Sequence, residues 1–159
     1  MKKEPIFIAD TKFIFRTNFE GNPDKDKYHN SYRRGNIIIP TEEQAMELLD
    51  QGFNVKATKP REGEEEGFVP TYYVAINLKY GNYYRPHVYL VTNGVAAELE
   101  EDRVGTIDDI YVLNVNATLN PRIDEERGSA TLYVSQLYVE QEVDEDPWAE
   151  RYEWRQDDE

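Results

Sequence analysis

Alternation of apolar and polar residues over long segments is the feature that most limits what this chain can fold into. Residues 71–80, TYYVAINLKY, place Val74, Ile76 and Leu78 on one side of an extended chain. Residues 110–121, IYVLNVNATLNP, repeat the same pattern. Because successive side chains of a strand point to opposite faces, both segments are predicted to be strands with one buried face.

The last alternating segment, residues 130–141, changes its phase. Leu132 and Val134 fit one register, whereas Leu137 fits the other. One extra residue in a strand moves every following side chain to the opposite face. The phase change therefore predicts a β-bulge near Ser135.

Shorter extended segments are predicted at residues 11–19, 36–40, 53–61 and 87–94. In the first of them, Phe13 and Phe15 are expected on one side of the strand. Residues 41–52, TEEQAMELLDQG, predict a short amphipathic helix with an apolar face of Ala45, Leu48 and Leu49, because Thr41 can cap its start, Gln44 occupies the capping-box position and Gly52 suits its end.

Residues 97–109 are compatible with a second short helix or a turn. Five or six strands with one or two short helices predict an all-β fold. The expected architecture is an OB-fold-like five-stranded barrel, and a β-sandwich built from the same strands is the alternative.

The composition excludes several kinds of site. The 159 residues include no cysteine and two histidines, so disulfides, thiolate zinc sites and cysteine nucleophiles are excluded. No nucleophile elbow, phosphate-binding loop or metalloprotease motif is present. We therefore predict no catalytic residue, metal or cofactor. No apolar run approaches the ~20 residues of a membrane-spanning helix, and no secretory signal is evident, so an intracellular protein is expected.

The net charge of −14 argues at first against binding a polyanion. However, residues 140–159 hold ten acidic and two basic residues, a net charge of −8, which leaves −6 for residues 1–139. Four further glutamates lie in the loop at residues 61–67. A high charge density without alternation is typical of a mobile segment. We expect a folded domain over residues 1–142 and a flexible acidic tail over residues 143–159.

Aromatic and basic residues gather in residues 79–89, KYGNYYRPHVY, and in neighbouring loops. Proteins that bind single-stranded nucleic acid combine aromatic faces, on which bases stack, with cations that follow the phosphates. The candidate DNA-binding residues are Arg16, Phe19, Tyr32, Arg33, Arg34, Lys56, Lys59, Arg61, Tyr73, Lys79, Tyr83, Tyr84, Arg85 and His87.

Tyrosine is also favoured in strands, so some of these rings are candidates for the core instead. Tyr72, Tyr80 and Tyr111 share a face with aliphatic neighbours, which favours burial, and both interpretations stay open for the tyrosines of the turn. The strongest candidates for contact with nucleic acid are Lys79, Tyr83, Tyr84 and Arg85.

Several stretches, in the same order along residues 13–152, resemble the OB-fold single-stranded DNA-binding proteins of tailed bacteriophages. They are RTNFEG, NIIIPTEEQAMELLDQGFNVKATKPREGEE, YYVAINLKY with RPHVYLV, LEEDRVGTIDDIYVLNVNATLNP and GSATLYVSQLYVEQEVDEDPWAERY. The final residues, RQDDE, depart from the tails of that family, which finish on an aromatic residue.

The resemblance implies a non-enzymatic protein, monomeric or dimeric, that coats single strands during phage DNA replication and recombination in the host bacterial cytoplasm. Its acidic tail would compete with DNA or recruit phage or host replication and recombination proteins. The matching DNA-binding positions are Arg16, Phe19, Lys56, Lys59, Arg61, Lys79 and Arg85, and the partner-binding positions of the tail are Trp148, Tyr152 and Trp154.

A second class of function is an acidic DNA mimic that binds a host DNA-binding protein. The composition suits such a mimic, but a mimic has no use for a tyrosine-rich, cationic hairpin. Binding to oligo-dT that weakens with salt would separate the two classes. An enzyme built on paired carboxylates is the least favoured class, because no orienting partner accompanies any pair.

Overall fold

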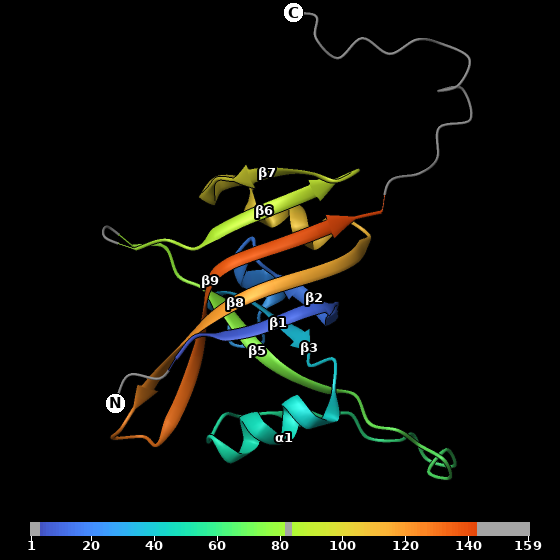
Figure 1. Ribbon diagram of the computed structural model, residues 1–159. Helices are drawn as coiled ribbons and strands as arrows, with labels where there is room; N and C mark the ends of the chain where they lie inside the picture. The colour runs from blue at the N-terminus through green and yellow to red at the C-terminus, as the bar shows by residue number, and fades with distance from the viewer. Residues whose placement is uncertain (1–3, 82–83, 143–159) are drawn as a thin grey trace, which may run out of the picture.

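The computed structural model describes residues 4–81 and 84–142 and is built mainly of β-strands (Figure 1). This confirms the predicted all-β class with short helices, although the sheet has nine strands where the sequence indicates five or six. The predicted acidic tail, residues 143–159, lies outside the described residues. The elements are β1 (Ile6–Thr11), β2 (Phe13–Asn18), the 3-10 turn η1 (Pro23–Lys25), β3 (Arg33–Ile38), α1 (Glu42–Asp50), β4 (Lys56–Ala57), β5 (Tyr72–Leu78), β6 (His87–Thr92), β7 (Val95–Leu99), the 3-10 segment η2 (Glu101–Asp109), β8 (Val112–Asp124) and β9 (Ser129–Gln141).

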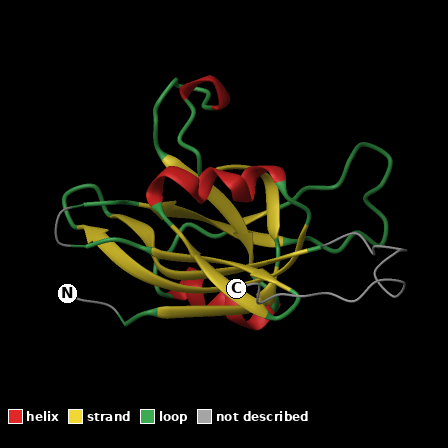
Figure 2. Ribbon diagram, turned by 90° about the horizontal axis from the view of Figure 1, so that it is seen from above, coloured by secondary structure: helices red, strands yellow, loops and turns green. Residues whose placement is uncertain are grey.

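The main path of the sheet begins and ends on one stretch of chain. Neighbouring strands follow the order β1-β8-β9-β5-β3-β2, and every pair is antiparallel except β9 with β5. The two ends of this path, β1 and β2, are separated only by Lys12, whose carbonyl accepts a hydrogen bond from the Ile38 amide at 2.9 Å. The strands thus close into a barrel, from which the loops project outward (Figure 2).

The predicted bulge in β9 is confirmed. Its pairing with β8 shifts register between Thr118 and Leu119, which leaves Ser135 of β9 without a partner. Before the bulge β9 lies beside β5, and after it β9 runs parallel to β6. Leu132, Val134, Leu137 and Val139 are all buried. The change of phase therefore keeps the apolar residues inside while the strand changes its neighbour.

The predicted helix α1 forms with the expected cap. The hydroxyl of Thr41 accepts a hydrogen bond from the Gln44 amide at 3.1 Å, as in other N-capped helices. Ala45 and Leu48 are buried, whereas Leu49 of the predicted apolar face is exposed. Figure 1 shows α1 at the lower end of the barrel, below β3 and β5, opposite the hairpin of β6 and β7.

The first strand differs from its prediction. Phe13 is partly buried against the core, but Phe15 has a backbone φ of +63° and is 61% exposed. The register of β2 with β3 shifts between Ile14 and Asn18. Phe13 and Phe15 therefore do not share a face, because this irregularity interrupts the alternation on which the expectation rested.

Residues 97–109, expected to form a helix or a turn, are divided between two elements. The first residues extend β7, which pairs with β6, and the remainder form the 3-10 segment η2. Val104 and Ile107 of η2 are buried, so this segment closes one side of the core.

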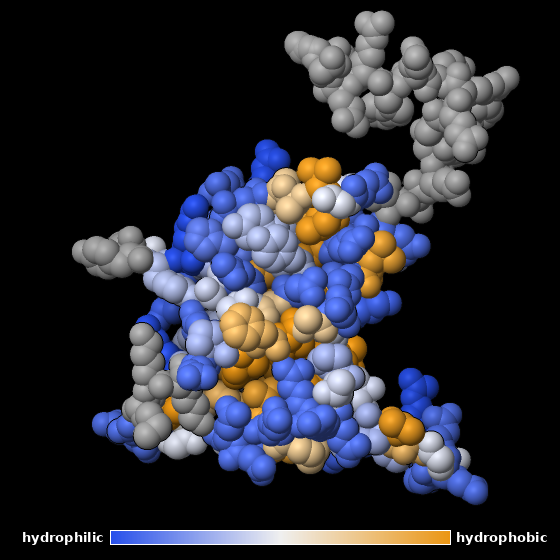
Figure 3. Space-filling view, in the orientation of Figure 1, coloured by the Kyte–Doolittle hydropathy of each residue, from blue (hydrophilic) through white to orange (hydrophobic). Residues whose placement is uncertain are grey.

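Some large apolar side chains remain on the surface. Phe7 of β1 is 67% exposed and Val95 of β7 is 69% exposed. The face in Figure 3 is mainly hydrophilic, with apolar patches near its middle, where β1 lies in Figure 1, and at its upper edge, where β6 and β7 lie. Among the described helices, none combines the length and the apolar character needed to cross a membrane.

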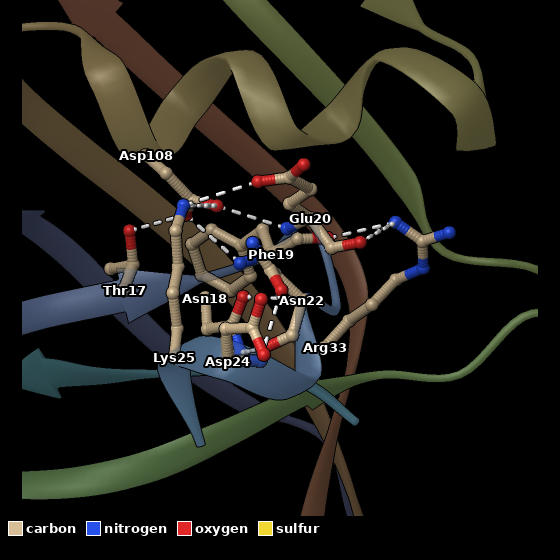
Figure 4. Close-up of polar contacts among 9 residues, drawn as sticks. All are labelled: Thr17, Asn18, Phe19, Glu20, Asn22, Asp24, Lys25, Arg33 and Asp108. Carbon is tan, nitrogen blue, oxygen red and sulfur yellow. Dashed lines mark hydrogen bonds and ion pairs between the residues drawn. The ribbon is translucent and has the colours of Figure 1, made fainter. Parts of the chain in front are cut away.

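A buried carboxylate attaches η2 to the end of β2 (Figure 4). The side chain of Asp108 has no exposed surface. One of its oxygens accepts hydrogen bonds from the Thr17 hydroxyl at 2.6 Å and the Phe19 amide at 2.9 Å. The other accepts from the Glu20 amide at 2.9 Å and lies 4.0 Å from the Lys25 ammonium. Asp108 thus fixes the start of the loop that leads to β3.

Replacing Asp108 by alanine should lower the free energy of unfolding by about 3 kcal/mol, because two backbone donors lose a charged acceptor. Thr17→Val removes only one of the donors and should cost about 1 kcal/mol. Urea denaturation followed by circular dichroism measures both values. Equal losses in the two variants would show that the backbone donors find other partners.

Candidate functional site

One row of outward-facing side chains crosses four neighbouring strands. Arg34 of β3 pairs with Asn77 of β5. Tyr133 of β9 pairs with Asn77 on one side and with Asn120 of β8 on the other. Six of the eight residues that adjoin them in the chain are buried, namely Gly35, Ile76, Leu78, Leu119, Leu132 and Val134, and the other two, Arg33 and Pro121, are half-buried. The row therefore lies on the outer surface of the barrel.

The ring of Tyr133 lies close to two cations. The ammonium of Lys79 is 5.7 Å from the ring centroid, and the guanidinium of Arg122 is 5.9 Å from it. Lys79 directly follows β5, and Arg122 lies in β8, so the two cations come from the strands on either side of β9. Such contacts stabilise a cation only modestly at an exposed site. The positive charges consequently stay available to an anion.

Aromatic side chains stand at both ends of the row. The guanidinium of Arg34 lies 5.1 Å from the ring centroid of Tyr32, a residue that is 59% exposed. At the other end, the Asn120 amide donates a hydrogen bond to the Tyr84 hydroxyl at 2.9 Å. We call this set the outer row; its members are Tyr32, Arg34, Asn77, Lys79, Tyr84, Asn120, Arg122 and Tyr133.

A second aromatic pair lies farther along β5. The rings of Phe15 and Tyr73 meet edge to face, with centroids 5.2 Å apart, and Tyr73 pairs with Lys56 of β4. Tyr73 and Asn77 are four residues apart in one strand, which corresponds to about 13 Å. The positive φ of Phe15 is unfavourable for a bulky residue and directs an apolar ring to the solvent. This combination marks Phe15 as a candidate binding residue.

Three basic residues of the predicted cluster, Arg33, Arg85 and His87, already contact carboxylates. Arg85 lies 3.7 Å from Glu98 and 3.4 Å from Glu100. His87 Nδ1 lies 2.9 Å from Glu98. Arg33 lies 3.5 Å from Glu101 and also donates to the Phe19 carbonyl at 2.9 Å. By contrast, within the described part of the chain Arg34, Lys79 and Arg122 have no carboxylate within ion-pair distance.

The predicted site residues thus fall into separate groups. Tyr32, Arg34, Lys79 and Tyr84 belong to the outer row, and Tyr73 with Lys56 lies beyond it. Arg16, Lys59 and Arg61 are exposed, and within the described residues they make no side-chain hydrogen bond, ion pair or ring contact with the row. Phe19 is fully buried with its ring against Phe13, so its ring is not accessible for stacking. Outside the described residues lie Tyr83, Trp148, Tyr152 and Trp154.

Four members of the outer row, together with Phe15, were absent from the prediction. Tyr133 had a usable signal, because it lies between Leu132 and Val134 and alternation alone places it on the outer face. Asn77, Asn120 and Arg122 had no such sequence signal, because nothing in the sequence tells which strands are neighbours.

Tyr80 lies between the two groups of cations and carries a buried hydroxyl. Among the described residues this hydroxyl has no hydrogen-bond partner. The guanidinium of Arg33 lies 5.7 Å from the centroid of the ring. Burial raises the pKa of Tyr80 from 10.0 to about 12, against the smaller opposing effect of Arg33. The phenol is therefore a neutral group set among charged side chains.

A family model described as "Putative phage ssDNA-binding domain" matches residues 1–154 of the chain. No curated protein matches the chain.

Because the pKa of Tyr80 is higher in the folded chain than in the unfolded one, the folded chain keeps this proton between about pH 10 and 12. This contribution to stability is complete below about pH 10 and is lost as the pH rises through 12. Tyr80→Phe should therefore lose less stability than the unmutated protein between neutral and alkaline pH, as measured by urea denaturation. At neutral pH the variant should be no less stable, since the hydroxyl has no partner. If both proteins lose the same amount of stability between neutral and alkaline pH, the raised pKa does not belong to Tyr80.

Proposed function

Because the chain belongs to the phage ssDNA-binding domain family, we propose that its outer row binds single-stranded DNA without selecting a sequence. The observation that carries this proposal is the ring of Tyr133 between the charges of Lys79 and Arg122. Every base has an aromatic face, so a base can stack on this ring whatever its identity. The flanking phosphates then lie near the two cations. Because neither cation is paired with a carboxylate of the described residues, no ion pair has to break when the phosphates bind.

The remaining aromatic residues extend this path in both directions. Tyr32 and Tyr84 provide rings at the two ends of the outer row, and Phe15 with Tyr73 provides a second stacking position. Amide side chains at Asn77 and Asn120 can donate to or accept from any base, which suits binding without sequence preference. No step of bond breaking is required, and we propose a binding protein rather than an enzyme.

The connectivity supports an OB-fold. When β1 and β2 are counted as one interrupted strand, the barrel strands are β1–β2, β3, β5, β8 and β9, and the third and fifth of them pair in parallel. In OB-folds the face formed by the second and third strands binds oligonucleotides. Here these strands are β3 and β5, which contribute Arg34 and Asn77 to the outer row.

We further propose that the protein coats single strands during phage replication or recombination, in the cytoplasm of the host bacterium. Residues 143–159 hold eight acidic and two basic residues, a net charge of −6. This tail would compete with DNA for the cations of the barrel. Its aromatic residues, Trp148, Tyr152 and Trp154, suit contact with a replication or recombination protein.

Titration of the full-length protein with fluorescent oligo-dT tests the binding site. Tyr133→Leu keeps an apolar side chain but removes the aromatic face, so binding should weaken about five- to a hundredfold, which corresponds to about 1–3 kcal/mol. Tyr111→Leu is the matched control, because Tyr111 is 81% exposed and adjoins the opposite end of β8 from Arg122. Affinity should also fall with salt, with a slope of about 0.7 per phosphate bound. If the two substitutions change the affinity for oligo-dT equally, Tyr133 is not a stacking position. If the protein is a DNA mimic, it will not bind oligo-dT at all.

Deletion of residues 143–159 tests the role of the tail. The truncated protein should bind oligo-dT more tightly at low salt, and the difference should shrink as salt screens the charges. Replacing Trp148, Tyr152 and Trp154 by serine keeps the charge of the tail and should leave the affinity unchanged. Equal or weaker binding by the truncated protein at matched salt would contradict competition by the tail.

A further inference from the structure

Three glutamates contact three basic residues that lie outside the outer row, namely Arg33, Arg85 and His87. They lie within residues 98–101, where β7 ends and η2 begins. Glu98 contacts His87 and Arg85, Glu100 contacts Arg85, and Glu101 contacts Arg33. One short acidic segment thus contacts three basic side chains that come from β3, from β6 and from the loop before β6.

The contacts of Arg85 and His87 are accessible to solvent. The exposed fractions of the side chains are 50% for Arg85, 67% for Glu100, 42% for His87 and 31% for Glu98, whereas Arg33 is only 23% exposed. Exposed ion pairs contribute little to the stability of a fold. Each carboxylate can therefore be exchanged for another anion without a large loss of stability.

One of the paired cations is continuous with the outer row. Arg85 follows Tyr84, which is hydrogen-bonded to Asn120 of the row. Arg33 is next to Arg34 in β3 but points to the opposite face of that strand, because successive side chains of a strand alternate. Between Arg33 and Arg85 lies Tyr80, whose buried hydroxyl has no partner among the described residues. A strand of nucleic acid that leaves the outer row at Tyr84 therefore meets Arg85 next.

Carboxylates and phosphodiesters are alike in the way they bind arginine. Both are anions that accept hydrogen bonds from a guanidinium. Glu98 and Glu100 are two residues apart, which is about 7 Å in an extended chain. This segment therefore presents successive negative charges to the cations, as a single strand of DNA does.

We propose that Arg33, Arg85 and His87 form a second phosphate-binding site that residues 98–101 occupy in the free protein and that the DNA backbone enters by displacing Glu98, Glu100 and Glu101. This inference rests on the proposed function of the outer row. Displacement of the glutamates also gives the Tyr80 hydroxyl an anion to which it can donate. The DNA first binds the unpaired cations of the outer row and reaches the second site only by exchange.

The test compares two triple variants of the full-length protein in titrations with oligo-dT. Glu98→Gln, Glu100→Gln and Glu101→Gln together remove the carboxylates that contact Arg33, Arg85 and His87. Glu62→Gln, Glu64→Gln and Glu66→Gln change the net charge equally, at exposed positions in the loop between β4 and β5. The first variant should bind about three- to tenfold more tightly than the second at low salt, and its salt slope should be steeper by about 0.7 for each phosphate added.

Two additional substitutions test whether the gain in affinity for oligo-dT comes from the second phosphate-binding site. In the first triple variant, Arg85→Gln should remove most of the gain, and Tyr80→Phe should reduce it without lowering the midpoint of thermal unfolding. Where the triple variant is less stable than the unmutated protein, the single variant Glu100→Gln is used instead. It removes one of the two carboxylates that contact Arg85 and should show a smaller gain in affinity with an unchanged midpoint of thermal unfolding.

Equal affinity of the two triple variants, or no gain with Glu100→Gln, would overturn the second site. If the unmutated protein still binds oligo-dT through Tyr133, the proposed function stands without it. Absence of binding in every variant would overturn both proposals together.

Discussion

The parallel contact between β9 and β5 at Tyr133 and Asn77 is the interaction on which the rest of the structure depends. It joins the two halves of the barrel, because β9 is also paired with β8 and β5 with β3. The same contact brings an aromatic ring, an amide and the cations of two further strands into one line. Barrel closure and the outer row are thus two results of a single strand pairing.

The bulge at Ser135 makes this arrangement possible. Without the bulge, β9 would expose to solvent either Leu132 and Val134 or Leu137 and Val139. With the extra residue, β9 keeps both sets buried and leaves β5 for β6 after the contact at Tyr133. The hairpin of β6 and β7 is thereby added to the barrel, and with it the acidic segment that faces Arg33, Arg85 and His87.

Most of the strands, α1 and the bulge could be predicted from the sequence, because each depends on a local pattern. The outer row could be predicted only in part. Tyr84 and Lys79 were found through composition, whereas Asn120 and Arg122 are brought to Tyr133 by pairing between distant segments. The pairing of Arg85 with Glu98 and Glu100 also depends on the fold, so a count of charges overestimated the free cations of the hairpin.

The backbone of Phe15 has a consequence for the comparison of related sequences. Its left-handed conformation suits glycine or asparagine better than phenylalanine, and its exposed ring adds little to the core. Folding and ligand binding therefore select for different residues at this position. In a lineage that has ceased to bind nucleic acid, drift should replace the aromatic ring by glycine or asparagine here sooner than at Phe19, whose burial keeps it under selection for folding alone.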